Sequence, residues 1–341
     1  MKIKIVFVLF MCYSFGFSQV GGEQIFNFLN VPTSAKQAAL GGKVLTLIDD
    51  VNQGIWNPAM INQEMDNQLA VNYVNFLADV NYGSVSFAHL FTKRFGTLHG
   101  GITFVDYGKL IGADEQGNET GTFYARDIAV SIGYAYQIPW SDFYVGANIK
   151  GINAMIDNYT STGVAADLGI TYYEYKKPYV FTAVIRNMGY QINAFDEQRE
   201  KLPLSIEIGM SYELEKIPLK WYVTADNLQK WNISVQNPSN AETSIDGTTT
   251  NKKITFLDNA MRHFIVGAEF FPKKNFNLRL GYNFRRAKEL KLTETRTFAG
   301  FSAGFGIKFG TIKFNYAYTK YHPASNTSTF SLQFDLNSKL R

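Results

Sequence analysis

Residue types that could catalyse a reaction or bind a metal are few in this chain, and their spacing does not form a site. The acidic stretch 114–119 lacks the alternating oxygen ligands and closing glutamate of a calcium loop, so we interpret it as a solvated loop. The only cysteine, Cys12, lies in the N-terminal apolar segment. The four histidines share no ligand spacing such as i, i+4 on a helix: His89, His99, His263 and His322. The sequence therefore predicts no enzymatic activity, no metal and no cofactor.

What dominates the chain instead is an alternation of apolar and polar residues from Leu69 to Asn337. In one segment Phe276 and Leu278 alternate with Asn277 and Arg279. Side chains along a strand point alternately to opposite faces, so each segment has one apolar and one polar face. Fourteen segments follow this pattern: 67–77, 80–92, 95–108, 121–138, 141–156, 161–175, 178–190, 202–215, 217–230, 260–272, 275–287, 295–309, 310–321 and 327–337.

The apolar faces indicate a membrane barrel. No apolar run reaches the roughly 18–20 residues of a membrane-spanning helix, and in lipid only helices and closed barrels satisfy every backbone group. A soluble sandwich or propeller is the alternative, but it does not explain charged residues on the face opposite the aromatic one. Facing lipid, Arg or Lys would cost about 2–4 kcal/mol each. We therefore predict a 14-stranded antiparallel transmembrane β-barrel with four lumen charges: Glu207, Glu269, Arg279 and Arg285.

The connections between segments indicate an orientation. Those after even-numbered segments are short, and most of those after odd-numbered segments are longer: 109–120, 191–201, 231–259 and 288–294. Bacterial barrels have short periplasmic turns and longer extracellular loops. The pattern predicts an outer-membrane barrel with both termini in the periplasm. The short connection near residues 78–79 is the exception.

The first 66 residues differ from the rest. Residues 1–18 have the basic start, apolar core and small-residue exit of a signal peptide. Residues 19–66 lack alternation, are partly helical, and are predicted to form a hatch, which leaves 67–341 for the barrel. The chain carries 33 Lys and Arg against 29 Asp and Glu. A net charge of +4 is too small and too scattered to indicate nucleic-acid binding.

A short motif stands just before the first strand. Asn57-Pro58-Ala59 follows a helical segment that ends at Gly41-Gly42. This arrangement resembles the N-terminal hatch of the FadL family, whose members have fourteen-stranded barrels. The longer stretch 21–42, with Asp49-Asp50-Val51 and the Asn-Pro-Ala motif, resembles the PorQ family of the Bacteroidetes type IX secretion system, within the FadL-like superfamily.

The PorQ resemblance implies a non-enzymatic anchor in the outer membrane. In that family the barrel tethers PorZ at the cell surface and joins PorU and PorV in an attachment complex that links cargo to lipopolysaccharide. We expect the partner surface in the long loops, which contain apolar residues that equally could pack on the loop itself or the barrel rim. These candidate partner-binding residues are Trp231, Ile233, Val235, Ile254, Phe256 and Leu257.

Two other functions remain open from the sequence. By analogy with FadL, the chain could be a channel for uptake of small hydrophobic compounds, which predicts a mostly apolar pocket between hatch and wall. The inward charges favour a polar, plugged lumen instead. A third possibility is a structural barrel that stabilises lipopolysaccharide packing. In each case Phe26, Phe28 and Leu29 are expected to anchor the hatch.

Overall fold

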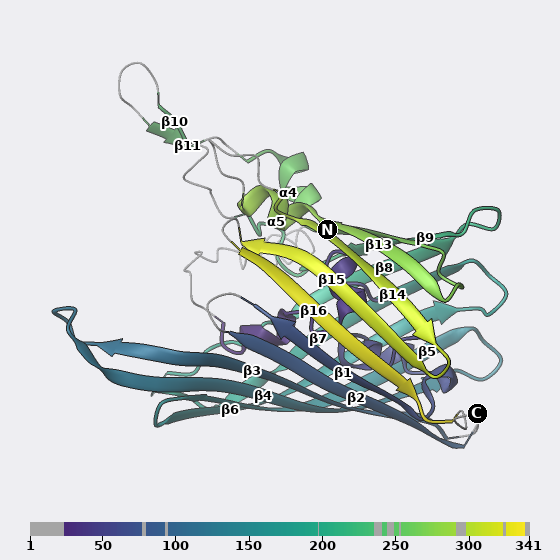
Figure 1. The fold of residues 1–341 in the computed structure, drawn as a ribbon, viewed down its shortest axis with the longest axis horizontal. Coiled ribbons are helices and arrows are strands. Elements are labelled where there is room, and N and C mark those ends of the chain that lie inside the picture. The colour runs from purple at the N-terminus through teal and green to yellow at the C-terminus, as the bar shows by residue number, and fades with distance from the viewer. Residues whose placement is uncertain are drawn as a thin grey trace, which may run out of the picture.

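The computed structural model describes residues 24–76, 80–92, 95–196, 198–234, 241–243, 249–251, 254–290, 298–322 and 325–337. The predicted signal peptide and Val235 lie outside these residues. The described chain forms a closed antiparallel β-barrel of fourteen strands with its N-terminal segment inside (Figure 1). The predicted barrel and strand number are confirmed.

Each wall strand falls within one of the fourteen alternating segments, give or take a few residues at its ends. The wall strands are β1 (Gln68–Asn75), β2 (Asn81–Thr92), β3 (Gly96–Ala113), β4 (Glu119–Gln137), β5 (Phe143–Ile156), β6 (Tyr159–Tyr173), β7 (Tyr179–Asn193), β8 (Ser205–Glu213), β9 (Leu219–Ala225), β12 (Phe264–Phe270), β13 (Phe276–Asn283), β14 (Phe301–Phe309), β15 (Ile312–His322) and β16 (Ser325–Asp335). The long connection after β9 contains a small hairpin of β10 (Ala241–Thr243) and β11 (Thr249–Asn251).

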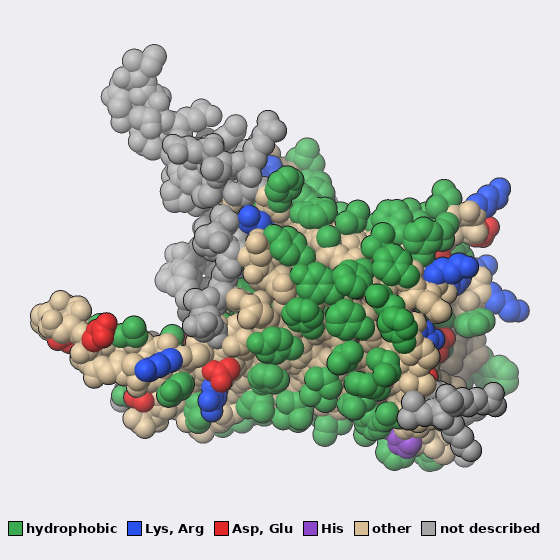
Figure 2. Space-filling view, viewed as in Figure 1, with side chains coloured by type: hydrophobic (Ala, Val, Ile, Leu, Met, Phe, Trp, Pro, Cys, Tyr) green, Lys and Arg blue, Asp and Glu red, His purple; other side chains and the backbone are tan. Residues whose placement is uncertain are grey.

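The alternation places apolar residues outside and polar residues inside. On β16, Phe330 and Leu332 are about 40% exposed, whereas Ser331 and Gln333 are buried in the lumen. Figure 2 shows hydrophobic side chains spread across the outer wall. An apolar outer band opposite a polar interior is the pattern of a barrel solvated by lipid. None of the helices that the structure describes is long and apolar enough to traverse a bilayer.

The wall is uneven in height. Strands β3 and β4 have 18 and 19 residues, whereas β9 and β12 have 7 each. The predicted loop 109–120 was therefore wrong, because both strands continue as a hairpin beyond the rim and leave only residues 114–118 as a turn. A register shift between Asp106 and Lys109, at Gly108 with φ of +72°, lets the pairing resume after a bulge.

Two predicted strand boundaries also need correction. The segment 275–287 stops being a strand at Asn283, where the side chain of Asn283 accepts a hydrogen bond from the Arg286 amide and starts α5 (Phe284–Glu289). The segment 260–272 begins instead with the end of α4 (Phe256–Arg262). Arg285 therefore lies on a helix beyond the end of the strand. It is not on the inner face of the wall.

Residues 24–66 fill the lumen as a chain of short helices. These are the 3-10 helices η2 (Asn27–Asn30), η3 (Pro58–Met60) and η4 (Gln63–Met65), and the α-helices α2 (Ala35–Ala39) and α3 (Gln53–Trp56). The helix α2 ends at the predicted Gly-Gly. The Gly42 amide bonds to the Gln37 carbonyl at 2.9 Å, with Gly41 and Gly42 at φ of +103° and +108°.

Candidate functional site

The Asn-Pro-Ala motif is a buried joint between the hatch and the wall. Asn57 is fully buried and donates from Nδ2 to the Leu45 carbonyl at 2.9 Å and to Thr182 Oγ1 at 2.8 Å. Its Oδ1 accepts the Ala59 amide at 3.0 Å, which caps η3, and Pro58 occupies the first helical position where no amide is needed. One side chain thus ties together a hatch loop, a helix start and strand β7.

Glycines in the wall make room for this joint. A Cβ on Gly146 of β5 would collide with the Pro58 carbonyl group, and one on Gly169 of β6 would lie 2.7 Å from Asn57 Oδ1. Gly146 and Gly169 face each other across the β5–β6 ladder. The motif is seated where paired glycines let two backbones approach closely.

A second joint lies beyond β9, β8 and β7 in the closed strand order. The Leu40–Gly41 backbone packs on Gly267 of β12 and Gly281 of β13, which also pair across their ladder. A Cβ on Gly267 would lie 2.9 Å from the Leu40 carbonyl oxygen, and one on Gly281 would collide with the Gly41 amide. Of the predicted hatch residues, Asn57, Pro58 and Ala59 meet one glycine pair of the wall and Gly41 meets the other, whereas Gly42 lies next to Pro32, Arg286 and Tyr321.

Buried charges hold the hatch between these joints. We call Lys43, Arg186, Glu207 and Asp226 the inner network. Lys43 Nζ lies 3.2 Å from Glu207 and 3.0 Å from Asp226, and Arg186 lies 3.5 Å from Glu207. The Arg186 and Glu207 side chains are 0% exposed. Arg186 also donates to the Leu29 carbonyl at 3.0 Å and covers the Trp56 ring at 3.9 Å.

A second group combines three buried charges, Lys36, Glu269 and Arg279, with two that reach solvent, Asp49 and Lys313. We call Lys36, Asp49, Lys313, Glu269 and Arg279 the vestibule network. Lys36 lies 2.8 Å from Asp49, Lys313 lies 3.3 Å from Asp49, and Arg279 lies 2.8 Å from Glu269. The Asp49 side chain is 52% exposed. The Lys36 ammonium holds the pKa of the Asp49 carboxyl well below its usual range.

The vestibule network opens onto a cavity of about 780 Å³. We call this cavity the vestibule. It lies at the end of the barrel with the short turns, because residues of the β6–β7, β8–β9 and β12–β13 turns line it. Figure 2 shows Lys and Arg side chains projecting at this end, at the right of the view. The vestibule is thus a polar chamber on one side of the hatch.

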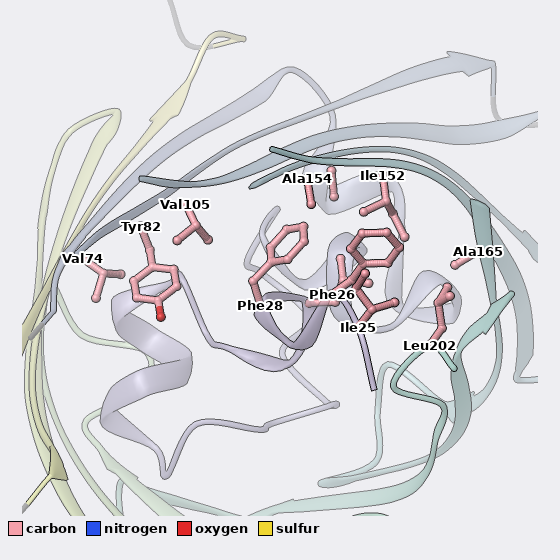
Figure 3. Close-up of a cluster of buried hydrophobic side chains, with 12 residues drawn as sticks. Ile25, Phe26, Phe28, Val74, Tyr82, Val105, Ile152, Ala154, Ala165 and Leu202 are labelled. Atoms are coloured by element: carbon pink, nitrogen blue, oxygen red, sulfur yellow. The ribbon is translucent and has the colours of Figure 1, made fainter. Parts of the chain in front are cut away.

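The lumen on the long-loop side is apolar. Phe26, Phe28 and Leu29 of the hatch pack against Tyr82, Val105 and Ile152 of the wall (Figure 3). A gap of only about 20 Å³ lies between Phe28, Leu29 and Trp56 and the wall. The predicted anchoring role of the three hatch residues agrees with this packing. This narrow gap is much smaller than the mostly apolar pocket predicted for a channel, and Thr33, Thr103, Ser131 and Lys150 also line it.

The predicted partner-binding residues are partly gathered into one patch. Trp231 stacks on Phe256, with ring centroids 4.8 Å apart, and on His263 at 5.5 Å. Phe256 and Leu257, on α4, are 75% and 70% exposed. Ile233 and Ile254 are half-buried, and Val235 lies outside the described residues. We call Trp231, Phe256 and Leu257 the rim patch.

The lumen charges are distributed differently from the prediction. Glu207, Glu269 and Arg279 are buried in the lumen, but Arg285 is a rim residue 4.0 Å from Asp226. The sequence analysis did not single out Lys36, Lys43, Asp49, Arg186 and Asp226. Arg186 occupies an inward position of a predicted strand, so its alternation was a usable signal. The described residues contain no cluster of His, Cys, Asp and Glu that could bind a metal.

Comparison with known proteins identifies the fold. No protein-family model and no curated protein matches the chain. Among solved structures, it is similar to the Ralstonia pickettii toluene transporter TbuX, with a TM-score of 0.53 and 12% identity over 91% of this chain and 100% of that one. It is also similar to a deltaS2 mutant of the monoaromatic hydrocarbon channel TodX, with a TM-score of 0.51 and 14% identity over 90% of this chain and 98% of that one. The chain therefore shares the fold of these two proteins, and in this structure that fold is a closed fourteen-stranded β-barrel with a partly helical hatch in its lumen.

Proposed function

We propose that this chain is a non-enzymatic outer-membrane channel for small hydrophobic compounds, closed by its hatch. The apolar cluster of the hatch and the wall carries this proposal. A neutral aromatic compound would exchange water for contacts with Phe28, Leu29 and Ile152. Support comes also from the fold, which spans the whole length of a protein described as a toluene transporter.

We further propose that the long loops are extracellular and both termini periplasmic. Gln68 at the start of β1 pairs with Asp335 at the end of β16, so both ends of the barrel chain lie at one edge. The short turns that line the vestibule lie at that same edge, as expected for the periplasmic side. A hydrophobic compound would then reach the apolar cluster first and the vestibule second.

The hatch must move for passage. A gap of about 20 Å³ holds no more than one water molecule, whereas ligand pockets measure roughly 300–1,000 Å³. The ring of Phe28, on the helix η2, lines this gap. We therefore expect a closed resting state in which Phe28 acts as the stopper of the apolar side.

The test is uptake of labelled toluene by intact cells whose lipopolysaccharide layer retards hydrophobic compounds. Cells producing this protein should take up toluene faster than cells without it, and Phe28→Ala should increase the rate several-fold by widening the gap. Phe181→Ala is the matched control, because Phe181 is 44% exposed on the outer wall. Equal uptake with and without the protein would refute the channel.

A second candidate is the secretion-system anchor implied by the PorQ resemblance, with PorZ bound directly, PorU and PorV joined through the complex, and contact with lipopolysaccharide. The rim patch favours it, because three large apolar side chains are exposed at the long-loop end. Its test is recovery of PorZ with the purified barrel. Phe256→Ser with Leu257→Ser should abolish recovery, and Phe181→Ser should not. Undiminished recovery with the double variant would rule out the rim patch as the anchoring surface.

A further inference from the structure

The vestibule has more cationic than anionic side chains. Nine Lys or Arg residues and five Asp or Glu residues line it. Because the whole chain has an excess of only four positive charges, this imbalance is concentrated at one place. Low-dielectric walls around a cavity focus such a field and raise the local concentration of counter-ions.

Three of the five acidic side chains of the vestibule already have cationic partners within the protein. Asp49 is held by Lys36 and Lys313, Glu269 by Arg279 and by the Tyr222 hydroxyl at 2.8 Å, and Glu213 by Lys273 at 2.7 Å. The charge of each of these three carboxylates is thus already balanced by at least one cation. The vestibule lysines outside these ion pairs therefore remain available to bind another anion.

Lys220 is the best placed of these lysines. It lies half-buried on β9 between Glu213 of β8 and Glu269 of β12 in the strand register, but both acids are bound elsewhere. In the described part of the chain, no carboxylate oxygen lies within 4.0 Å of Lys220 Nζ. Its only specific contact there is the face of the Tyr222 ring, 5.5 Å away.

The Asp49 carboxylate is an oxyanion that the vestibule lysines already bind. Its carboxylate lies between two ammonium groups at 2.8 and 3.3 Å, yet half of its side chain is exposed to the vestibule. The hatch thus presents its own oxyanion to Lys36 and Lys313. Another oxyanion that entered the vestibule would find the same donors, with Lys220 in addition.

We propose that the vestibule binds a multivalent oxyanion at Lys220, Lys313 and Lys36, in competition with the Asp49 carboxylate of the hatch. The volume of about 780 Å³ suits a small molecule. Phosphate groups supply the chemistry, whether from a soluble phosphorylated compound or from a phospholipid headgroup at the membrane edge. The proposal does not depend on what crosses or docks on the long-loop side.

The experiment measures binding of inorganic pyrophosphate by titration calorimetry, with the full chain in phosphatidylcholine nanodiscs. Saturable one-site binding is expected. Lys220→Gln and Lys313→Gln should each weaken it about tenfold, since each removes a charge-assisted contact. Lys313→Arg should stay within about twofold of the wild type because the charge remains. Lys109→Gln is the control, an exposed lysine on the β3–β4 hairpin at the other end.

These titrations test both the location of the anion site and the source of the bound anion. Absence of binding at millimolar pyrophosphate, or equal binding by Lys220→Gln, Lys313→Gln and the wild type, would overturn the proposal. Repeating the titration in phosphatidylglycerol nanodiscs distinguishes the sources. Weaker pyrophosphate binding there would mean that lipid headgroups occupy the vestibule, and unchanged binding would mean a soluble ligand.

Discussion

The inner network and the vestibule network both pair a lysine of the hatch with carboxylates, but in different surroundings. Lys43 pairs with Glu207 and Asp226 outside the hatch, whereas Lys36 pairs with Asp49 of the hatch itself, which Lys313 links to the wall. The Glu207 side chain is completely buried, whereas that of Asp49 is 52% exposed. The distances are similar, so the contrast between the two networks lies in access to water.

This difference in exposure indicates which of the two networks keeps its ion pairs and which one exchanges them. Removing one member of a buried ion pair leaves a charge without a partner in a poorly polarisable interior, which is costly. Removing one member of an exposed pair leaves a charge that water can solvate, at little cost. We therefore expect the inner network to maintain the seated hatch and the vestibule network to be exchangeable.

The largest effect should come from Glu207→Gln. Lys43 and Arg186 would lose a shared buried carboxylate, and we expect a loss of about 3–5 kcal/mol in the free energy of unfolding. Urea unfolding in lipid vesicles measures it. The control Glu215→Gln removes an exposed vestibule charge and should change stability by less than about 0.5 kcal/mol. Equal losses in the two variants would mean that burial does not separate the networks.

A smaller effect should follow from Gly146→Ala. The new Cβ would collide with the Pro58 carbonyl group, so either the hatch shifts or the wall strains, at a cost of about 1–3 kcal/mol. Ion conductance across planar bilayers should rise if the hatch shifts. Gly151→Ala is matched on the same strand, since a Cβ there meets nothing within 4 Å. If both variants conduct like the wild type, the glycine seat does not hold the hatch.

The smallest effect should come from Asp49→Asn, at less than about 1 kcal/mol, because the Asp49 side chain is 52% exposed and Lys36 keeps Glu269 as a partner at 4.0 Å. Since Lys36 depresses the pKa of Asp49, the ionised carboxylate stabilises the folded state above its unfolded pKa of about 3.9, and this contribution is lost as pH falls through the lower folded value. The difference in melting temperature between wild type and variant should be constant from pH 5 to 8 and shrink below pH 4. A difference that grows on acidification would contradict this assignment.

Periodicity carried most of the fold prediction. Successive side chains of a wall strand face lipid and lumen in turn. The alternating apolar residues of β13 and β16 therefore predicted both the strands and which of their faces is apolar. The pattern failed where a local hydrogen bond competed with the ladder. At Asn283 a single side-chain cap turned the chain into α5, and Arg285 left the wall with it.

The candidate site was less accessible from the sequence. The Asn-Pro-Ala and Gly-Gly motifs could be located in the sequence, but the wall residues that they contact could not. Gly146 and Gly281 are distant in the chain, and nothing in the sequence distinguishes them from the other glycines of the strands. The charges of the hatch were equally ambiguous. Whether Asp49 or Asp50 faces the vestibule depends on a turn whose geometry is set by the surrounding barrel.

Strand β16 makes two contacts that complete the fold. It closes the cylinder by pairing with β1, and its Ser331 hydroxyl accepts the Ala35 amide at the start of α2 at 2.8 Å, across 296 residues of chain. Contacts this distant in sequence form late and slowly when a chain folds. A chain shortened before Ser325 would keep open backbone edges on β1 and β15, and the Ala35 amide at the start of α2 would lose the Ser331 hydroxyl. Pairing of β16 therefore closes the barrel and fixes the start of α2 in one event.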